Sequence, residues 1–509
     1  MILINSSPKN ALKIFQPFLP IYVPVGIGCL LAEAETKAIG VQVIDEQVEN
    51  NILKLIGAYT KKMSRPYIFG FSVLTVALKN AIQLASALKS LYQDCLIIFG
   101  GIHPTAMPEE TLSYGCVDIV LRGEGERILF QLYKCLKARQ DFRHLDSISY
   151  RSNGDVKHNK ISPVFIDLDS SRFPYHRFNS KQYDLGFILS SRGCPHECIF
   201  CSNRVTTGRR YRFKPAQAII DELELLYEKY NRRHITFVDD NLLVDKERIY
   251  LIIDNIKKKG LDKKMSFNFQ ARADNVSRSL LNDLYSAGFR SIFFGIETSS
   301  DRIMKIIKKN ETVGQCIQAV KLAKDAGFHV SATFIYGLPT ETYADRMNCA
   351  RLSKELNLDM VRFNNATPYP GTELYEIAKS KKLLNVRGLY ENFVSVSTFI
   401  ENPFKKVPFS YVSEGNTEDE IRRDILFSYF AFYLDFNKLK KIFTRPDEGV
   451  GWFNAGRKAI EFLRNIPAIL FLGCMLLLKL CQFFYYMVLK KETAISFRKF
   501  LNIFEKLPK

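Results

Sequence analysis

Three closely spaced cysteines carry the strongest chemical signal in the sequence. Cys194, Cys198 and Cys201 form a Cys-x-x-x-Cys-x-x-Cys pattern. Thiolates at this spacing can surround one metal cluster within a single loop, and Gly193 and Pro195 are the turn residues that such a loop needs. Three thiolates leave one iron of a 4Fe–4S cluster without a protein ligand, so that iron can chelate a substrate. The pattern therefore predicts a 4Fe–4S cluster with one open coordination position.

Two other interpretations of these cysteines remain. A structural zinc site usually has four protein ligands, and His196 could be the fourth, although it lies inside the loop and could scarcely reach the same metal. The cysteines could also be unligated, but the other eight of the 11 are scattered singly along the chain and fit small buried apolar residues. No basic and apolar export signal precedes them, so a disulfide framework is not expected.

The cysteine loop must be positioned by the elements around it. It follows an apolar run at residues 186–189, and five further strand-and-helix units follow, so the pattern predicts six units of a parallel barrel. The later strands are expected at residues 235–238, 266–269, 291–295, 330–335 and 360–363. Parallel barrels carry their chemistry at the carboxyl ends of the strands.

Polar residues stand at most of these strand ends. They are Asp239, Asp240 and Asn241, Arg272 with Asp274, Glu297 to Ser299, Gly337 to Glu341, and Asn364 with Asn365. A helix N-cap is the alternative role for Asp240, Ser299 and Thr340. Their convergence on one rim favours a pocket.

The N-terminal third predicts a second parallel sheet. Apolar, β-branched runs at residues 2–4, 41–44, 67–71, 96–99 and 117–121 are separated by helical patterns, such as those at 25–38 and 77–91. Continuous runs are typical of strands covered on both faces. The loops after the last three strands contain Ser72 to Thr75, Gly100 to Thr105 and Arg122 to Glu126. Glycines there let a ligand approach the backbone, and the hydroxyls can bind a polar edge.

Residues 1 to about 140 resemble the cobalamin-binding domain attached to many radical S-adenosylmethionine enzymes. By that resemblance the cobalamin slot is lined by Ser72, Thr75, Gly100, Gly101, Glu124 and Gly125. The loop at residues 5–18 contains no histidine, so the element that supplies a lower axial ligand in cobalamin mutases is absent. We therefore expect a cobalt without histidine from that loop, and we expect His103 to be structural or close to the nucleotide tail.

Residues 180 to 375 resemble the radical S-adenosylmethionine core. The resemblance implies that Asp239 and Asp240 lie near the methionine amine and Glu297 near the ribose, while Gly337 and Leu338 lie near the adenine. The family's pattern Gly-x-Ile-x-Gly-x-x-Glu on the fifth strand is only partly present. Thr333 stands at its first glycine and Thr340 at its glutamate, with Glu341 one residue later.

The expected architecture is α/β with four parts. A Rossmann-like cobalamin-binding domain covers residues 1–140, a linker 141–180, a partial (β/α)6 radical S-adenosylmethionine barrel 181–375, and a mainly helical, substrate-shaping C-terminal domain 376–509.

The expected activity follows from the resemblance. The enzyme would reductively cleave S-adenosylmethionine at the cluster to a 5′-deoxyadenosyl radical, with an external electron donor such as flavodoxin or ferredoxin. Methylation of an unactivated carbon with cobalamin as the methyl donor is expected. Oxidative cyclisation or a carbon-skeleton rearrangement is one alternative, and a non-catalytic carrier of the cluster or of cobalamin is another.

Charge and a C-terminal apolar run suggest further partners. The 72 Lys and Arg against 53 Asp and Glu give a net charge of +19, which attracts anions, but no basic block interleaved with aromatics indicates a nucleic-acid surface. Residues 466–489 are mostly apolar and contain Lys479 and Gln482. As a helix they would be about 36 Å long, against about 30 Å for a bilayer core.

This C-terminal run has two interpretations, which are a buried helix of the substrate domain and a membrane contact that spans or lies on the bilayer. Ten Lys or Arg against three Glu within residues 451–509 suit a contact with anionic lipid. A hydrophobic substrate such as a lipid, an isoprenoid or a tetrapyrrole would agree with both. We expect a cytoplasmic protein, associated with the inner face of the membrane if that contact exists.

Overall fold

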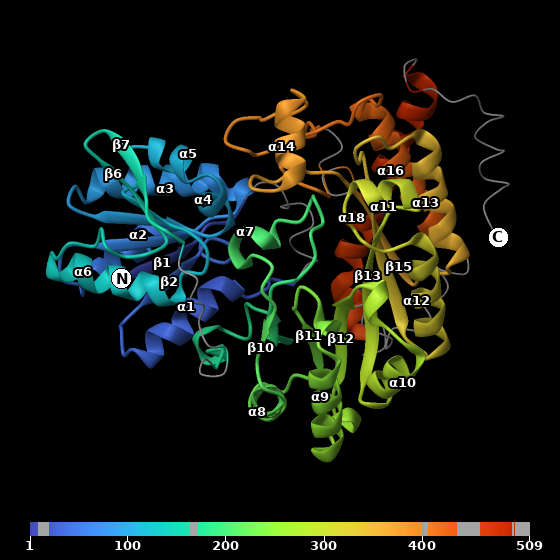
Figure 1. Ribbon diagram of the computed structural model, residues 1–509, viewed down its shortest axis with the longest axis horizontal. Coiled ribbons are helices and arrows are strands. Elements are labelled where there is room, and N and C mark those ends of the chain that lie inside the picture. Colours follow the sequence, from blue (N-terminus) through green and yellow to red (C-terminus); the bar gives the residue numbers. More distant parts are fainter. Residues whose placement is uncertain are drawn as a thin grey trace.

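A computed structural model describes residues 1–8, 20–161, 168, 172–396, 398, 401, 406–434, 459–490 and 493 of the 509-residue chain. Two domains, each built on a parallel sheet, lie side by side, and a mainly helical segment follows the second one (Figure 1). The expected α/β class and the order of its parts are therefore confirmed.

The first domain contains a seven-stranded sheet with helices on both faces. Its strands are β1 (Ile2–Asn5), β2 (Gln42–Asp45), β3 (Ile68–Ser72), β4 (Leu96–Gly100), β5 (Ile119–Leu121), β6 (Ile148–Ser152) and β7 (Asp155–His158). Its helices are α1 (Val25–Thr36), α2 (Ile52–Thr60), α3 (Leu78–Leu91), α4 (Ile102–Ala106), α5 (Pro108–Ser113) and α6 (Glu126–Ala138).

The strand order is β2-β1-β3-β4-β5-β6-β7, and β1 to β5 are parallel. Residues of α1 and α6 share one apolar cluster with one face of the sheet, and residues of α2 and α3 share another with the opposite face. Because both faces are covered, the strands read as continuous apolar runs in the sequence.

The sheet of this domain continues to His158, beyond the boundary at residue 140 that the sequence suggested. Strands β6 and β7 are added to β5 in antiparallel order. After Ser149 their residues are half-buried or exposed, so they lack the continuous apolar run that marks a covered strand. The segment expected as a linker thus begins as part of the sheet.

The second domain contains a six-stranded parallel sheet, the partial barrel. Its strands are β8 (Phe187–Ile188), β11 (His234–Phe237), β12 (Ser266–Ala271), β13 (Phe289–Glu297), β14 (His329–Tyr336) and β15 (Met360–Asn365), in the order β15-β14-β13-β12-β11-β8. The helices between them include α8 (Ala216–Glu228), α9 (Lys246–Lys258), α10 (Arg278–Ser286), α11 (Asp301–Ile306), α12 (Val313–Asp325) and α13 (Tyr343–Glu355). All carboxyl ends of the strands therefore lie at one edge.

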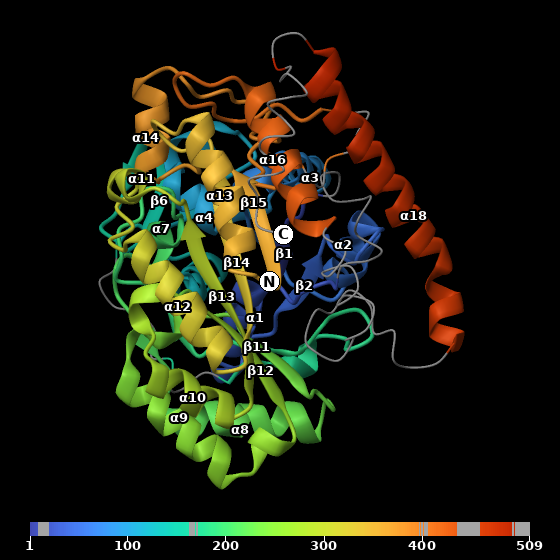
Figure 2. The same ribbon diagram turned by 90° about the vertical axis from the view of Figure 1, so that its right-hand side faces the viewer.

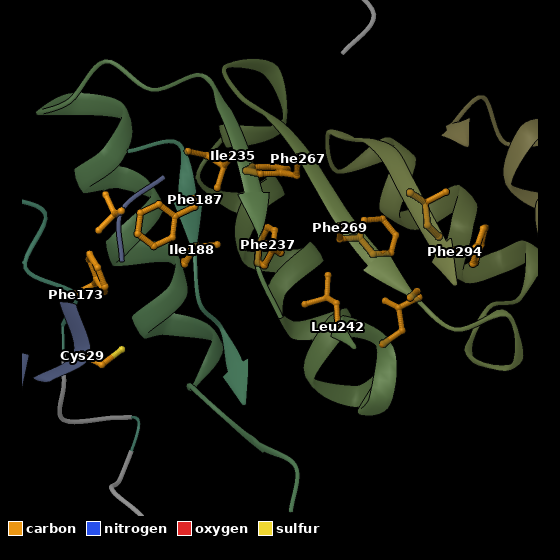
Figure 3. Packing of buried hydrophobic residues seen from close by; sticks show 14 of the residues in the cluster. Cys29, Phe173, Phe187, Ile188, Ile235, Phe237, Leu242, Phe267, Phe269 and Phe294 are labelled. Atoms are coloured by element: carbon orange, nitrogen blue, oxygen red, sulfur yellow. The ribbon is translucent and has the colours of Figure 1, made fainter. Parts of the chain in front are cut away.

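One apolar core crosses from the first domain into the second. Figure 3 shows Cys29 of α1 and Phe173 near Phe187 and Ile188 of β8, followed by the barrel residue Phe237. The ring centroids of Phe173 and Phe187 are 5.1 Å apart. This shared core holds the two sheets in a fixed relation.

The C-terminal part is helical. It contains α14 (Glu373–Ser380), α16 (Glu418–Tyr433) and α18 (Ala459–Phe484), and α18 ends in a π-helical turn at Tyr485–Leu489. Figure 2 shows α18 along one side of the molecule, next to α16. No helix within the described residues combines the length and the apolarity needed to cross a bilayer.

Candidate active site

The cysteine loop is fixed by two neighbouring carboxylates at the end of β11. The loop leaves the short strand β9 (Ser191–Arg192), which pairs with β10 (Arg212–Phe213). The N–H of Gly193 donates to the Asp240 carboxylate at 2.9 Å. Gly193 has a φ of +86°, and an added Cβ would overlap the backbone oxygen of Arg210, so only glycine fits this turn.

Asp239 holds the strand that leads into the loop. Its carboxylate accepts the backbone N–H groups of Ser190 at 2.7 Å and Ser191 at 2.6 Å, and it also accepts the Ser190 hydroxyl at 2.5 Å. Arg248, itself buried, donates to the Ser190 carbonyl at 2.8 Å. These contacts favour a positioning role for Asp239, whereas Asp240 lies at the wall of the cavity described below.

The three thiols lie in a half-buried loop. Burial raises the pKa of Cys194 and Cys198, and it raises the pKa of Cys201 to about 11. A bound metal reverses such a shift, because a coordinating thiol is deprotonated. Among the described residues no three His, Cys, Asp or Glu side chains converge closely enough for a single ion. Each cysteine of a 4Fe–4S cluster binds a different iron, so its sulfurs need not converge.

A buried group of charges lies close to this loop, at the carboxyl ends of β12 and β13. Arg272 binds Asp274 at 2.8 Å, and Lys309 lies 3.3 Å from Glu311 and 3.9 Å from Glu297. Burial raises the pKa of the Glu297 carboxyl to about 7. Burial alone would lower the pKa of Lys309, but Glu297 and Glu311 reverse the shift and raise it.

Several polar atoms of this group have no hydrogen-bond partner within the described chain. Arg272 Nη1 and Glu297 Oε2 are buried without such a partner, and among the described residues Glu311 Oε2 has only its ion pair with Lys309. Buried polar atoms are normally paired, so such a cluster indicates a missing ligand. An ammonium, a carboxylate and ribose hydroxyls are groups that these side chains could bind. The chemistry of the group therefore fits S-adenosylmethionine.

A cavity of about 430 Å³ lies between the two domains. The carboxyl ends of β3, β4 and β5 form one wall, through Ser72, Gly100, Gly101, Glu124 and Gly125. The barrel side forms the other wall, through Arg192 and Asn203, which flank the cysteine loop, and through Thr206, Thr207 and Asp240. Glycine backbone on one wall leaves room for a large flat ligand, so the cavity fits the cobalamin expected from the sequence.

Ion pairs join the two walls of the cavity. Arg192 of β9 lies 2.7 Å from Glu126 and 3.5 Å from Glu124. Arg212 of β10 also pairs with Glu124. Since the carboxylates belong to the first domain and the arginines flank the cysteine loop, the cavity and the loop are tied together.

The remaining predicted residues lie outside this cavity wall. Thr75 is buried at the start of a short 3-10 turn. Gly337 has a φ of +84° and donates its N–H to Glu341, whereas Leu338 packs in an apolar cluster with Ile199 of the cysteine loop. His103 is completely buried against Tyr390, with 5.0 Å between ring centroids. Most of the loop expected to lack an axial histidine, residues 9–18, lies outside the described residues.

Sequence reasoning missed several residues of the site. Arg192 stands two positions before Cys194 and could have been noted from that spacing. Lys309 and Glu311 follow the short helix α11 and not a strand, so no strand-end pattern marks them. Asn203 donates to Asp240 at 2.6 Å, which is a contact that only the fold reveals.

Comparison with known proteins identifies the class. Residues 17–132 match the B12 binding domain, and residues 188–353 match the radical SAM superfamily. An uncharacterized methyltransferase of Pyrococcus horikoshii is 31% identical over 418 residues, which are 81% of this chain and 88% of that protein. The chain therefore belongs to the radical S-adenosylmethionine enzymes that carry a cobalamin-binding domain. As a member it uses a 4Fe–4S cluster, S-adenosylmethionine and cobalamin.

More distant relatives bear different names. The anaerobic magnesium-protoporphyrin IX monomethyl ester cyclase of Cereibacter sphaeroides is 24% identical over 76% of this chain, which spans 62% of that protein. The hopanoid C-3 methylase of Methylococcus capsulatus is 25% identical over 73% of this chain and 70% of that protein.

Among solved structures, the cobalamin-dependent radical enzyme OxsB with aqua-cobalamin and S-adenosylmethionine bound has a similar fold. The TM-score is 0.69 at 18% identity, over 99% of this chain and 75% of that one.

Proposed function

We propose that this enzyme transfers a methyl group to an unactivated carbon of an apolar substrate. The observation that carries the proposal is the cavity shared by the two domains, because it is lined by residues of the cobalamin-type loops and by Arg192 and Asn203, which flank the cysteine loop. Methyl transfer to a carbon that must first lose a hydrogen atom requires both cofactors near one substrate.

The roles of the individual residues form part of the proposal. Cys194, Cys198 and Cys201 bind the cluster. Ser72, Thr75, Gly100, Gly101, Glu124 and Gly125 hold cobalamin. Glu297 binds the ribose, and Gly337 and Leu338 lie against the adenine. Asp239 and Asp240 position the loop near the methionine amine. Arg272, Lys309 and Glu311 supply the charges that surround the methionine end.

When bound, the cofactors supply hydrogen abstraction from carbon and the methyl group, and the chain supplies orientation and exclusion of water. The carboxylates of Asp239, which is buried, and Asp240, which is half-buried, fix the loop through backbone N–H groups. Arg192 and Arg212 join the two walls of the cavity through their ion pairs with Glu126 and Glu124.

The names of two relatives support an apolar substrate. One acts on a hopanoid and another on a magnesium porphyrin ester. A rigid polycyclic isoprenoid or a tetrapyrrole agrees with both names, and we propose this substrate class.

Oxidative cyclisation is a second candidate, favoured by the similarity to the magnesium-protoporphyrin cyclases. The two reactions differ in the fate of S-adenosylmethionine. Methylation consumes one molecule as the radical source and another as the methyl source, with two electrons from outside. It therefore releases 5′-deoxyadenosine and S-adenosylhomocysteine in equal amounts. Cyclisation releases 5′-deoxyadenosine without S-adenosylhomocysteine.

We propose a flavodoxin or a ferredoxin as the external electron donor. Such donors are acidic, and the net charge of +19 attracts them. The exposed segment from Gly208 to Arg210 packs directly on Gly193 of the cysteine loop, which makes it a short route for an electron. We also propose that the enzyme works at the cytoplasmic face of a membrane, where apolar substrates are dissolved.

The test starts from anaerobically reconstituted, reduced protein with S-adenosylmethionine, cobalamin and a panel of hopanoid, isoprenoid and porphyrin substrates. We expect a substrate heavier by one CH2 group and equal amounts of the two nucleosides. Cys198→Ala should lose iron and nucleoside release, whereas Cys316→Ala, which removes a buried cysteine of α12, should keep both. Iron and nucleoside release that survive Cys198→Ala would contradict the cluster assignment. 5′-Deoxyadenosine without S-adenosylhomocysteine would favour the cyclase.

A further inference from the structure

The described side chains of α18 are apolar on the outer side as well as on the inner side, and the charged Lys479 is buried. Leu470, Leu477, Phe484 and Val488 are 64%, 63%, 54% and 63% exposed. Cys474 and Cys481 between them are exposed as well. The spacing of 4, 7, 11, 14 and 18 residues from Leu470 puts these six side chains on one side of the helix. We call these six residues the outer stripe.

The opposite side of the helix faces the protein and contains the charge. Lys479 is 2% exposed, and its ammonium donates to the Thr398 carbonyl at 2.8 Å and to Gln482 at 3.1 Å. Glu401 lies 3.9 Å away. A surface helix of a water-soluble domain has its apolar side inward and its charges outward. Here the charge is inward and the described outer side is apolar.

Aromatic contacts hold the inner side against α16. The ring centroid of Phe483 is 5.7 Å from that of Phe430 and 6.4 Å from that of Phe427. Tyr486 and Met487 are buried in the same cluster. Figure 2 shows α18 along one side of the molecule, with its upper end beside α16. The outer stripe is therefore presented as a fixed edge.

We propose that the outer stripe inserts into one leaflet of an anionic bilayer, with α18 parallel to the membrane plane. The stripe extends over 18 residues, or about 27 Å. It contains no strong hydrogen-bonding side chain, although protein interfaces usually carry about one hydrogen bond per 100–200 Å². The neighbouring Tyr485, 48% exposed, is a residue type that favours the lipid–water boundary. Without the buried Lys479, residues 451–509 still have a net charge of +6, which complements anionic headgroups.

The inference deepens the proposed function, because it rests on an apolar substrate that dissolves in the same leaflet. A helix that lies on the bilayer would bring the enzyme to its substrate and keep the barrel in water. The chemistry itself needs no membrane, since the cysteine loop and the cavity do not include the outer stripe.

The test is flotation of the reconstituted full-length enzyme with phosphatidylglycerol vesicles and with phosphatidylcholine vesicles. We expect the enzyme to float with the anionic vesicles. The double variant Leu477→Glu/Val488→Glu should float at least tenfold less. The matched control is Leu91→Glu/Leu251→Glu, which adds the same charge at two leucines exposed to 59% and 58% on α3 and α9. It should float like the wild type.

Equal flotation of the stripe variant and the wild type would overturn the proposal. A wild type that stays out of both vesicle fractions and forms a dimer in gel filtration would also overturn it, because the outer stripe would then bind a second copy. Thermal unfolding of each variant shows whether it is folded. A fluorophore on Cys474 that reports an apolar environment when vesicles are added would support insertion without any substitution.

Nucleoside release in detergent solution separates the two proposals. If the enzyme floats as expected but methylates no member of the panel, the proposed function fails and the membrane contact stands. If the stripe variant methylates a substrate in detergent but the wild type does not float, the proposed membrane contact is wrong and the proposed function stands.

Discussion

His103 shows what burial does to a single titratable residue. It is completely buried, and neither ring nitrogen has a hydrogen-bond partner within the described chain. Burial lowers its pKa from 6.5 to about 4. The folded chain therefore stays neutral at His103 between these pH values while the unfolded chain takes up a proton. Stability from this residue is present above pH 6.5 and is lost as the pH falls toward 4.

His103→Phe should remove this acid sensitivity. The phenyl ring keeps the packing on Tyr390 and has no proton to gain. Between pH 8 and pH 5 the wild type should lose about 2 kcal/mol more unfolding free energy than the variant. Denaturant unfolding of the metal-free protein at the two pH values measures the difference. His144→Phe, at an exposed histidine, should keep the wild-type slope, and an unchanged slope in His103→Phe would contradict the argument.

Some single residues of the site could be predicted from the sequence, and others could not. The cysteine spacing alone predicted the cluster, because the ligands are adjacent in the chain. Lys309 and Glu311 were missed, since they lie near Glu297 only through the packing of α11 and α12 beneath the sheet edge. Asp239 accepts from the backbone N–H groups of Ser190 and Ser191. A backbone contact does not depend on residue type, so the sequence could not predict it.

At the scale of elements, the turn after β4 depends on one glycine. Gly101 has a φ of +100°, and an added Cβ would lie 2.9 Å from the Val73 nitrogen and 3.0 Å from its oxygen. Gly101→Ala should cost about 1–3 kcal/mol through backbone strain and should move the loop that lines the cavity. We expect weaker cobalamin binding with unchanged iron content.

Absorbance titration with cobalamin and an iron assay check this result. Gly57→Ala on α2, where an added Cβ meets nothing within 4 Å, should bind cobalamin normally. Wild-type cobalamin affinity in Gly101→Ala would show that the turn does not shape the cavity.

The elements were predictable where both faces of a strand are covered. The expected strand at residues 96–99 and β4 (Leu96–Gly100) nearly coincide, and so do the expected helix at 77–91 and α3 (Leu78–Leu91). Strands β6 and β7 were missed because they lie at one end of the sheet and, after Ser149, contain only half-buried or exposed residues. The two-residue strands β9 and β10 are too short for any periodic pattern.

At the scale of the whole molecule, the cavity exists only because two domains meet. Sequence motifs predicted the loops on each wall, but the distance between the walls depends on packing between distant segments. Phe173 packs on Gly28 of α1, where an added Cβ would overlap its ring. Arg192 and Arg212 then pair with Glu124 and Glu126 across the boundary. Neither contact could be predicted from residue spacing, because each one joins residues that are far apart in the sequence.

Arg192→Met tests whether these ion pairs hold the domains around the cavity. Arg192 and Glu126 are both buried, so the variant leaves a carboxylate without its partner, at a cost of about 3–5 kcal/mol. We expect cobalamin affinity to fall by about tenfold or more, since a tenfold change needs only about 1.4 kcal/mol. Iron content should stay near the wild-type value, because Asp239 and Asp240 still hold the loop.

Two further variants, a control and a rescue, show why Arg192→Met loses cobalamin affinity. Arg278→Met breaks an exposed pair with Asp325 and should change stability by less than about 1 kcal/mol. Arg192→Met/Glu126→Gln removes the uncompensated charge as well. If Arg192 acts by joining the domains, the double variant should regain much of the cobalamin affinity, because the buried carboxylate is gone. A double variant as weak as Arg192→Met would instead show that the guanidinium binds cobalamin directly and that the shared apolar core alone keeps the domains together.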